Sequence, residues 1–383
     1  MHPFDYQLTT RLVFGPNRIE QLGELAKEQG AGRVLVVSDP GIVKAGHTER
    51  GVAALKAAGC EVLVDENVGE NPTTAHVEVG TERARDFRPD VLVGLGGGSS
   101  MDCAKGINFL YSCGGRMHDY WGVGKATKPM LPMIAVPTTA GTGSEAQSFA
   151  LISDAETHVK MACGDKKAAC KVALLDPTLT VTQPQRVTAL TGIDALAHAL
   201  ETYVTTKRNF MSILYSREAW RLLEKNFARV LEHPTDLAAR SGMQLGAFLA
   251  GTAIENSMLG ATHALANPLT AHFEVPHGQA IALMLPHVIR YNGERHRDWY
   301  CELLAYVAGT NGAPSVASGP DGLAEFLRKT AEAAGLETKL SACGVDENSL
   351  PTLAADAAKQ WTGTFNPRQV TVPDLLALYQ AAY

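Results

Sequence analysis

The first half of the chain alternates short apolar runs with stretches of helical character. Residues 33–39 (RVLVVSD) and 60–66 (CEVLVDE) are rich in β-branched side chains, and residues 90–100 (DVLVGLGGGSS) continue from such a run into glycines. Continuous apolar runs of this length are typical of strands that are buried on both faces. The stretches between them, 43–58 and 73–87, have the length and pattern of helices. This alternation predicts βαβ units and therefore a parallel sheet.

The same pattern predicts further elements on both sides of these units. The other expected strands are 7–14, the apolar part of 130–145, and three shorter ones at 149–154, 158–163 and 171–176. The other expected helices are 16–29, which starts at Gly15-Pro16, and 99–111.

The pattern changes after Asp176-Pro177, and from Pro184 onward no stretch resembles a strand. Alanine- and leucine-rich segments of helical length follow instead, at 192–205, 209–231, 235–254, 277–291, 295–308, 320–335, 346–359 and 373–382. A chain of 383 residues is also longer than a domain with a single hydrophobic core usually is. We therefore predict two domains, an α/β domain over 1–183 and an all-helical domain over 184–383.

Composition and charge exclude several classes of protein. The net charge is −6 and no block of lysines or arginines is present, so a nucleic-acid partner is not expected. No apolar run reaches the roughly 18 residues of a membrane span, and the N-terminus lacks the basic and then apolar pattern of a signal peptide. The seven cysteines are an odd number without a Cys-x-x-Cys pair, which is typical of reduced thiols. These features predict a cytoplasmic protein.

A glycine-rich loop, GLGGGSSMD at 94–102, follows one of the expected strands and begins a helix. Successive glycines let backbone N–H groups approach a phosphate, and the start of a helix favours an anion. The match to the dinucleotide fingerprint G-x-G-x-x-G is incomplete, because Ser99 stands where the third glycine would be. The loop also follows about the third strand, whereas the usual fingerprint follows the first. Alone, it would equally fit a tight turn from strand to helix.

A second loop of similar character strengthens the prediction of a cofactor. PTTAGTGSE at 137–145 also follows an apolar strand, and it offers hydroxyl groups beside Gly141 and Gly143. These hydroxyls belong to Thr138, Thr139, Thr142 and Ser144. Two such loops at the ends of apolar strands predict a cofactor that carries a pyrophosphate.

Asp39 ends the first buried strand and bears on the kind of dinucleotide. An acidic residue at this place can accept a hydrogen bond from an adenosine ribose hydroxyl and would repel a 2′-phosphate, which favours NAD over NADP. The sequence Asp-Pro-Gly is equally typical of a turn or a helix N-cap, so Asp39 alone does not decide.

Histidines in the second half form a candidate metal site. Asp194 and His198 are four residues apart, so on a helix they project from one face. His263 and His277 follow in segments rich in small residues. An aspartate with three histidines is a ligand set that divalent transition metals accept. The pair Asp194 and His198 alone would also fit a structural hydrogen bond. Other histidines compete for the role of ligand, namely His233, His272, His287 and His296.

The two candidate sites together predict alcohol oxidation. A divalent ion can bind an alcohol oxygen and lower its pKa, and this favours transfer of hydride from the carbinol carbon to a nicotinamide. Such chemistry needs no side-chain nucleophile.

These motifs make the chain similar to the iron-containing, or type III, alcohol dehydrogenases. That family includes lactaldehyde reductase, propanediol dehydrogenase and a class of NAD-dependent methanol dehydrogenases. The matching segments are GGGSSMDCAKG (96–106), PTTAGTGSE (137–145), the DP-x-L-T run (176–180), GIDALAHALE (192–201), GATHALANPL (260–269) and VPHGQAIALMLPHV (275–288). The resemblance implies a Rossmann-like N-terminal domain, a helical C-terminal domain and an active-site cleft between them.

The resemblance also implies a set of site residues. The metal ligands it implies are Asp194, His198, His263 and His277, which leaves His272 out of the ligand set. The cofactor contacts it implies are Asp39, Asn71, Gly97, Gly98, Ser99, Ser100, Thr138, Thr139, Lys160 and Leu179. Physical reasoning alone would assign Asn71 to a turn and Lys160 to a solvated surface.

One position departs from the family pattern. Many members carry a second histidine four residues after the third ligand, and here that residue is Asn267. On a helix Asn267 would share a face with His263, so it should border the metal or the nicotinamide. A histidine there could relay protons, whereas an asparagine can only form hydrogen bonds. His272 is the nearest candidate in sequence for that proton transfer, and the alternatives are water or a cofactor hydroxyl.

We expect an NAD-dependent and metal-dependent alcohol dehydrogenase for small primary alcohols or the matching aldehydes. The family name favours Fe²⁺, although the ligand set also accepts Zn²⁺, Mn²⁺ or Co²⁺. Relatives imply a homo-oligomer, a dimer or larger. The alternatives are a hydroxyacid-oxoacid transhydrogenase, a dehydroquinate-synthase-like lyase, and a non-catalytic scaffold. The first two would need cationic groups facing the site, which the segment LGATHALANPLTAHF lacks, and retention of all four expected ligands argues against the third.

Overall fold

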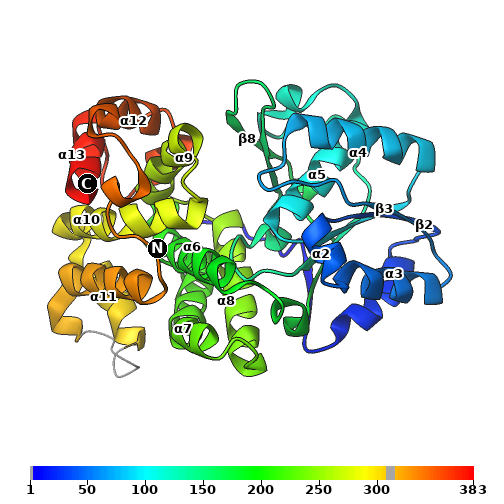
Figure 1. Cartoon of the computed structure of the whole chain (residues 1–383), viewed down its shortest axis with the longest axis horizontal. Helices are drawn as coiled ribbons and strands as arrows, with labels where there is room; N and C mark the ends of the chain where they lie inside the picture. Colours follow the sequence, from blue (N-terminus) through cyan, green and yellow to red (C-terminus); the bar gives the residue numbers. More distant parts are fainter. Residues whose placement is uncertain (1–2, 308–314) are drawn as a thin grey trace. The chain divides into compact units, whose positions relative to one another are not determined.

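A computed structural model describes residues 3–307 and 315–383 of the chain, which divide into two compact units (Figure 1). One unit is Gln7–Gln183, and the other comprises Pro184–Tyr383 together with the first residues through Tyr6. The grouping of Tyr6 differs from the expected span of 1–183 for the first domain. Its hydroxyl forms a 2.5 Å hydrogen bond with the hydroxyl of Tyr215, and this contact attaches the N-terminal segment to the helical unit.

The first unit contains the predicted parallel sheet, which has six strands. Its strands, in spatial order, are β1 (Arg11–Phe14), β9 (Val172–Leu175), β6 (Met133–Pro137), β4 (Val91–Gly96), β2 (Arg33–Val37) and β3 (Glu61–Asp65). The neighbouring pairs all run in the same direction. In the pairing of β4 with β6, Gly96 lies opposite Pro137. The two glycine-containing loops therefore leave adjacent strands at the same edge of the sheet.

Helices on both faces of the sheet explain why its strands are continuously apolar. Along β2, Val34 and Val36 pack into a core with Leu22, on one face. Leu35 and Val37 pack into a second core on the other face. The helices and helical turns of this unit are η1 (Arg18–Gln21), α1 (Leu22–Glu28), α2 (Pro40–Lys44), α3 (His47–Ala57), α4 (Thr74–Phe87), α5 (Gly98–Cys113), η2 (Met117–Tyr120), η3 (Ser144–Ala146), η4 (Lys166–Ala168) and η5 (Pro177–Thr180). The prediction of strands buried on both faces is confirmed for β2 and β4, whereas β3, at the edge of the sheet, is only partly buried.

Two of the expected helices are divided in the structure. The stretch 16–29 forms the short 3₁₀ turn η1 and then α1, and the stretch 43–58 falls across α2 and α3. Between α2 and α3, Gly46 has a φ of 79°, a conformation that glycine adopts without the cost that other residues incur. The apolar pattern continues through this break, so periodicity alone did not reveal it.

A small second sheet completes the α/β unit. It consists of β5 (Gly122–Val123), β8 (Lys160–Gly164) and β7 (Phe149–Ser153), in that order, with β7 antiparallel to β8. β7, β8 and β9 match the three short strands that were expected between 149 and 176, whereas β5 was not expected.

The second unit is helical throughout its described part, as expected. Its helices are α6 (Gln185–Val204), α7 (Phe210–Glu232), α8 (Leu237–Glu255), α9 (Ala261–Phe273), α10 (His277–Val307), α11 (Gly319–Ala333), α12 (Leu350–Ala357) and α13 (Val372–Ala382). Four short 3₁₀ turns connect them, namely η6 (Val316–Ser318), η7 (Ser341–Cys343), η8 (Glu347–Ser349) and η9 (Trp361–Phe365).

Two of these helices differ from the expected pattern. α9 was not among the predicted segments, and it contains Pro268, a residue that disfavours the interior of a helix. The expected helices 277–291 and 295–308 are joined in α10, with a kink at His296 where φ is −125° and ψ is 38°. The expected end at 308 lies outside the described residues.

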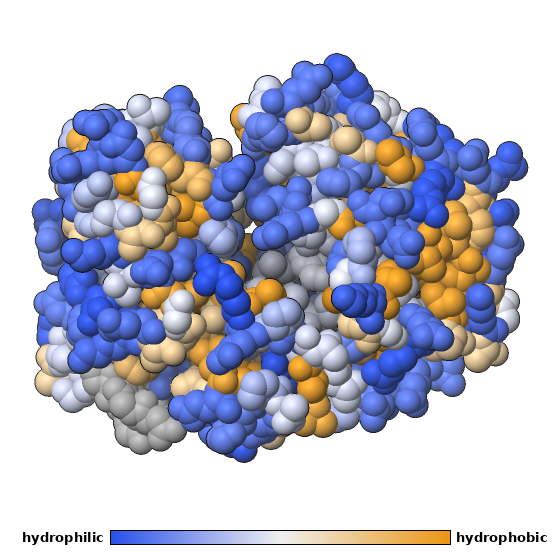
Figure 2. Space-filling model, in the orientation of Figure 1, coloured by the Kyte–Doolittle hydropathy of each residue, from blue (hydrophilic) through white to orange (hydrophobic). Residues whose placement is uncertain are grey.

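Among the described residues, no helix is both long enough and apolar enough to cross a membrane. On the face of the molecule in Figure 2, hydrophilic residues predominate and smaller hydrophobic patches lie between them.

Candidate active site

Helix α6 supplies the first two residues of the candidate metal site. It is buried along most of its length, and Asp194 and His198 are each only 5% exposed. Because they lie one turn apart on one face, His198 Nε2 comes within 3.3 Å of Asp194 Oδ1. Burial of a carboxylate and an imidazole in such an apolar helix is costly unless a partner or a ligand compensates them.

Helix α10 brings His277 to the same place because its second residue is a glycine. A Cβ atom on Gly278 would lie 2.2 Å from the backbone oxygen of Leu190, on α6. Any larger residue would push the start of α10 away from α6. His277, the first residue of α10, is thereby held with its Nε2 3.7 Å from Asp194 Oδ1.

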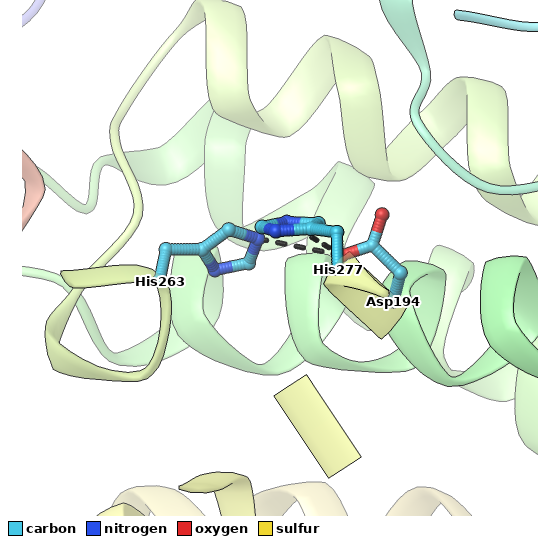
Figure 3. A group of neighbouring side chains, drawn as sticks. All are labelled: Asp194, His263 and His277. Atoms are coloured by element: carbon cyan, nitrogen blue, oxygen red, sulfur yellow. Dashed lines mark ion pairs between the residues drawn. The ribbon is translucent and has the colours of Figure 1, made fainter. Parts of the chain in front are cut away.

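Helix α9 supplies His263 in its first turn. Its Nε2 lies 3.4 Å from Asp194 Oδ1, and its ring stacks on that of His198 with centroids 4.8 Å apart. One ligand atom from each of Asp194, His263 and His277 lies within 4.8 Å of the other two. Figure 3 shows both histidine rings directed toward the carboxylate of Asp194. The structure thus gathers around one carboxylate the four residues that the resemblance implied as ligands.

The cluster has the properties of a metal site. Asp194 Oδ1 and His263 Nε2 are buried, and neither forms a hydrogen bond with any of the residues described. Buried polar atoms without partners are costly, about 1–3 kcal/mol each, unless a ligand satisfies them. Burial opposes ionisation of Asp194, but His198, His263 and His277 outweigh it and hold the pKa of the carboxyl well below its usual range. An ionised carboxylate and imidazole nitrogens suit iron, zinc or manganese.

Glu201 orients His263 and was not predicted from the sequence. Its carboxylate accepts a hydrogen bond from the backbone N–H of Thr262, at 2.7 Å, and a second one from His263 Nδ1. The second bond holds Nδ1 toward Glu201 and so directs His263 Nε2 toward Asp194. Burial disfavours the charged imidazole, yet Glu201 and Asp194 raise the pKa of His263 to about 9. The signal was present in the spacing, because Asp194, His198 and Glu201 lie at i, i+4 and i+7 on α6.

The two residues named as catalytic candidates lie in different surroundings. Asn267 is half-buried, one turn beyond His263 on α9, and its amide donates a 3.0 Å hydrogen bond to Gln360 Oε1. Gln360, which precedes η9, was not anticipated. His272 is exposed and forms a 2.8 Å ion pair with Asp356. Nine residues from His263 on a helix, it lies on the opposite face, so the geometry does not favour it for proton transfer.

The expected cofactor loops meet at the carboxyl ends of β4 and β6. Gly97 precedes α5, whose first-turn N–H groups have no partners within the helix. A Cβ atom on Gly98 would lie 2.7 Å from Thr142 Cγ2, so this glycine allows the two loops to touch. The hydroxyl of Thr138 is buried and has no hydrogen-bond partner within 3–307 or 315–383. An orphaned hydroxyl beside a helix N-terminus fits a bound phosphate group.

The other expected cofactor contacts lie in separate segments of the same unit. Asp39 caps α2 through one carboxylate oxygen and accepts a 3.1 Å hydrogen bond from the Ser100 hydroxyl through the other, so it is both a helix cap and a neighbour of the glycine loop. Asn71 is exposed with a left-handed φ of 52°. Lys160 is an exposed residue at the start of β8, whereas Leu179 is buried in η5.

Comparisons with known proteins agree with this reading. The model of the iron-containing alcohol dehydrogenase family matches residues 9–177, and that of the family's C-terminal domain matches residues 188–383. The chain is 32% identical to a 1,3-propanediol dehydrogenase of Citrobacter freundii, over 99% of both chains. It is 30% identical to an NAD-dependent methanol dehydrogenase of Bacillus methanolicus, over 97% of both.

Solved structures give the same result. A crystal structure of a 1,3-propanediol oxidoreductase covers the whole of both chains with a TM-score of 0.95 and 32% identity. A sulfoacetaldehyde reductase of Bifidobacterium kashiwanohense in complex with NAD⁺ covers 100% of this chain and 99% of its own, with a TM-score of 0.88 and 25% identity. By sequence and by fold, the chain belongs to the iron-containing alcohol dehydrogenase family.

Proposed function

We propose that this protein oxidises small primary alcohols with NAD and reduces the corresponding aldehydes, with a divalent metal held by Asp194, His198, His263 and His277. The proposal rests on a buried cluster in which imidazole nitrogens lie close to Asp194 Oδ1. Two atoms of this cluster, Asp194 Oδ1 and His263 Nε2, form no hydrogen bond with the described residues. Membership of an alcohol dehydrogenase family and relatives named for methanol and 1,3-propanediol support the class of substrate.

The chain's own residues would bind, orient and exclude water. When bound, the metal supplies a positive charge that polarises an alcohol hydroxyl. Asp194 offsets part of the metal's charge in a site from which water is largely excluded, since Asp194, His198 and His263 are each about 5% exposed. Glu201 accepts a hydrogen bond from Nδ1 and so holds the His263 ring with Nε2 directed at Asp194, where Nε2 would bind the metal on losing its proton.

For the cofactor, we propose that the start of α5 and the loop after β6 hold the pyrophosphate of NAD. The first-turn N–H groups of α5 would donate to phosphate oxygens. The hydroxyl of Thr138, which has no hydrogen-bond partner among residues 3–307 and 315–383, would donate to another phosphate oxygen. Asp39 Oδ2, which already accepts from Ser100, would also accept from a ribose hydroxyl and disfavour a 2′-phosphate. Asn71, Thr139, Lys160 and Leu179 complete the proposed contacts.

The metal assigned by this proposal is Fe²⁺, with Zn²⁺ or Mn²⁺ as alternatives. Affinity of nitrogen and oxygen ligands favours Zn²⁺ over Fe²⁺, so the metal present will depend on supply as well as on the site. Elemental analysis of the purified protein, followed by depletion and reconstitution with each ion, distinguishes them.

Formation of NADH from a panel of alcohols tests the function. We expect activity with methanol, ethanol, propanol and 1,3-propanediol, a strong preference for NAD over NADP, and loss of activity after chelation with recovery on adding metal. His263→Ala should abolish activity, and His272→Ala, a histidine on the same helix in an exposed ion pair, is the matched control. Alcohol-dependent NADH formation that persists after verified removal of all metal would contradict the proposal.

We also propose a cellular location and an oligomeric state for the enzyme. All seven cysteines are free, in agreement with a reducing compartment, and we propose a cytoplasmic location. We further propose a homo-oligomer of two or more subunits, which light scattering of the purified full chain would measure.

A further inference from the structure

A lysine with no solvent exposure lies in the second turn of α5. The side chain of Lys105 is 0% exposed, which is rare for a charged residue. Its ammonium group donates to the backbone oxygen of Ser144 at 2.7 Å, to the hydroxyl of Ser144 at 2.8 Å, and to the backbone oxygen of Phe149 at 2.8 Å. An ammonium group has three donors, so all are used within the protein. Lys105 therefore has no donor left for a ligand.

Asp102 and Ser144 complete a buried network around this lysine. The hydroxyl of Ser144 donates to Asp102 Oδ1 at 2.5 Å, and Lys105 Nζ lies 3.7 Å from the same oxygen. The backbone N–H of Leu151 donates to the other oxygen at 3.3 Å. Burial raises the pKa of Asp102, while Lys105, Ser144 and the proposed cofactor contact Lys160 oppose that rise. The motif DCAK, which follows the glycine loop, thus supplies both charged members of the network.

The network fixes the far end of the loop that follows β6. At its near end, the N–H of Thr138 donates to the backbone oxygen of Gly96 at 2.9 Å. In its middle, Thr142 is in close contact with Gly98. At its far end, Ser144 is held by Lys105 and Asp102. Three points of attachment join this loop to the start of α5.

We propose that Lys105, together with Asp102 and Ser144, is a positioning residue for the cofactor pyrophosphate. It sets the separation between the hydroxyls of the loop after β6 and the N–H groups at the start of α5, and it acts without touching the cofactor. This inference rests on the proposed function, because it assumes that these two loops hold NAD. It predicts that the network controls the affinity for NAD more than the rate of hydride transfer.

Three variants of the full-length, metal-loaded protein test this role. Ser144→Ala removes one hydroxyl from the centre of the network and is the deciding variant, because it leaves both charges paired. Lys105→Met combined with Asp102→Asn removes both charges together and so leaves neither one buried alone. Lys167→Met is the matched control, since Lys167 in the same unit also donates to a backbone oxygen, that of Ala126 at 3.0 Å.

The dissociation constant of NADH, measured by fluorescence titration, is the main readout. Losing a hydrogen bond to a charged group should weaken NADH binding about tenfold in Ser144→Ala and in the double variant. The KM for NAD should rise in parallel. The kcat at saturating NAD, the KM for the alcohol and the metal content should stay close to those of the wild type. Lys167→Met should leave all of these unchanged.

Two results would overturn the inference in distinguishable ways. If Ser144→Ala has a lower melting temperature but an unchanged NADH dissociation constant, the network stabilises the fold and does not position the cofactor. If the wild-type protein itself binds no NADH, the proposed function fails and this inference fails with it.

Discussion

Replacing Glu201 by glutamine should weaken metal binding while preserving the size of the side chain. The carboxylate of Glu201 accepts two hydrogen bonds, one from the N–H of Thr262 and one from Nδ1 of His263. A glutamine amide has one oxygen and one NH₂ group, so it can accept only one of these bonds in the same geometry. If its NH₂ group faces His263, the ring must accept at Nδ1 and carry its proton on Nε2. That proton would occupy the nitrogen proposed to bind the metal.

The size of the effect follows from the bond that is lost. A hydrogen bond to a charged group contributes about 1.5–3 kcal/mol, and removing the carboxylate partner of a metal-bound histidine typically lowers metal affinity by about 10–100-fold. We therefore expect the metal dissociation constant of Glu201→Gln to rise by about 10–100-fold. NADH affinity should not change, because the proposed cofactor contacts belong to the unit Gln7–Gln183.

Competition with a chelator of known affinity measures the metal dissociation constant directly. Glu218→Gln is a suitable control, since it makes the same chemical change on α7 in an exposed ion pair with Arg221. The melting temperature of metal-depleted protein separates an effect on the site from an effect on folding. A folded Glu201→Gln protein that binds metal within about twofold of the wild type would refute the assignment of Glu201 as the residue that orients His263.

Three further predictions concern other parts of the chain. Asn267→His should place a titratable group one turn from His263, so the pH profile of kcat should gain a limb near the ordinary histidine pKa; an unchanged profile would show that this position does not transfer protons. Burial raises the pKa of Glu145 from 4.5 to about 7, so the folded protein keeps a proton that the unfolded chain has released, and stability should fall as pH rises through this interval. The full shift corresponds to about 3 kcal/mol, and urea unfolding of Glu145→Gln at several pH values should show a flatter dependence than the wild type. Gly278→Ala would set a Cβ atom 2.2 Å from the Leu190 oxygen, so it should lower the free energy of unfolding by about 1–3 kcal/mol or more and reduce metal content; full metal content would contradict the proposed role of this contact.

The sheet could be predicted because its strands carry a strong local signal. The β-branched runs at β2 and β4 are buried on both faces, and this leaves no alternation that could be confused with a surface strand. Helix boundaries were harder to predict from the sequence where the backbone conformation of a single residue decides them. Gly46 separates α2 from α3 through its positive φ, and α9 continues through Pro268 despite the missing N–H group.

The candidate metal site was partly visible in the sequence. Asp194 and His198 were evident from their spacing, but spacing could not choose between His272 and the other histidines. That choice requires knowing that His263 and His272 share one helix, where nine residues place them on opposite faces. Contacts between segments that are distant in the sequence could not be predicted at all. The hydrogen bond from Asn267 to Gln360 and the contact of Gly278 with Leu190 exist only after the helices have packed.

The pairing of β1 has a consequence for how this protein is made. β1 is an edge strand, and among the strands of residues 3–307 and 315–383 it pairs with β9 alone, so that Arg11 lies opposite Val172. During synthesis the first strand must therefore wait, with its backbone hydrogen bonds unmade, until nearly half of the chain has left the ribosome. Asp176, directly after β9, then accepts hydrogen bonds from the backbone N–H groups of Asn17 and Ile19. Non-local pairing of this kind slows folding and leaves a strand exposed to other chains. A nascent chain that stalls before residue 172 would contain all the strands of the large sheet apart from β9, and β1 would still lack its partner.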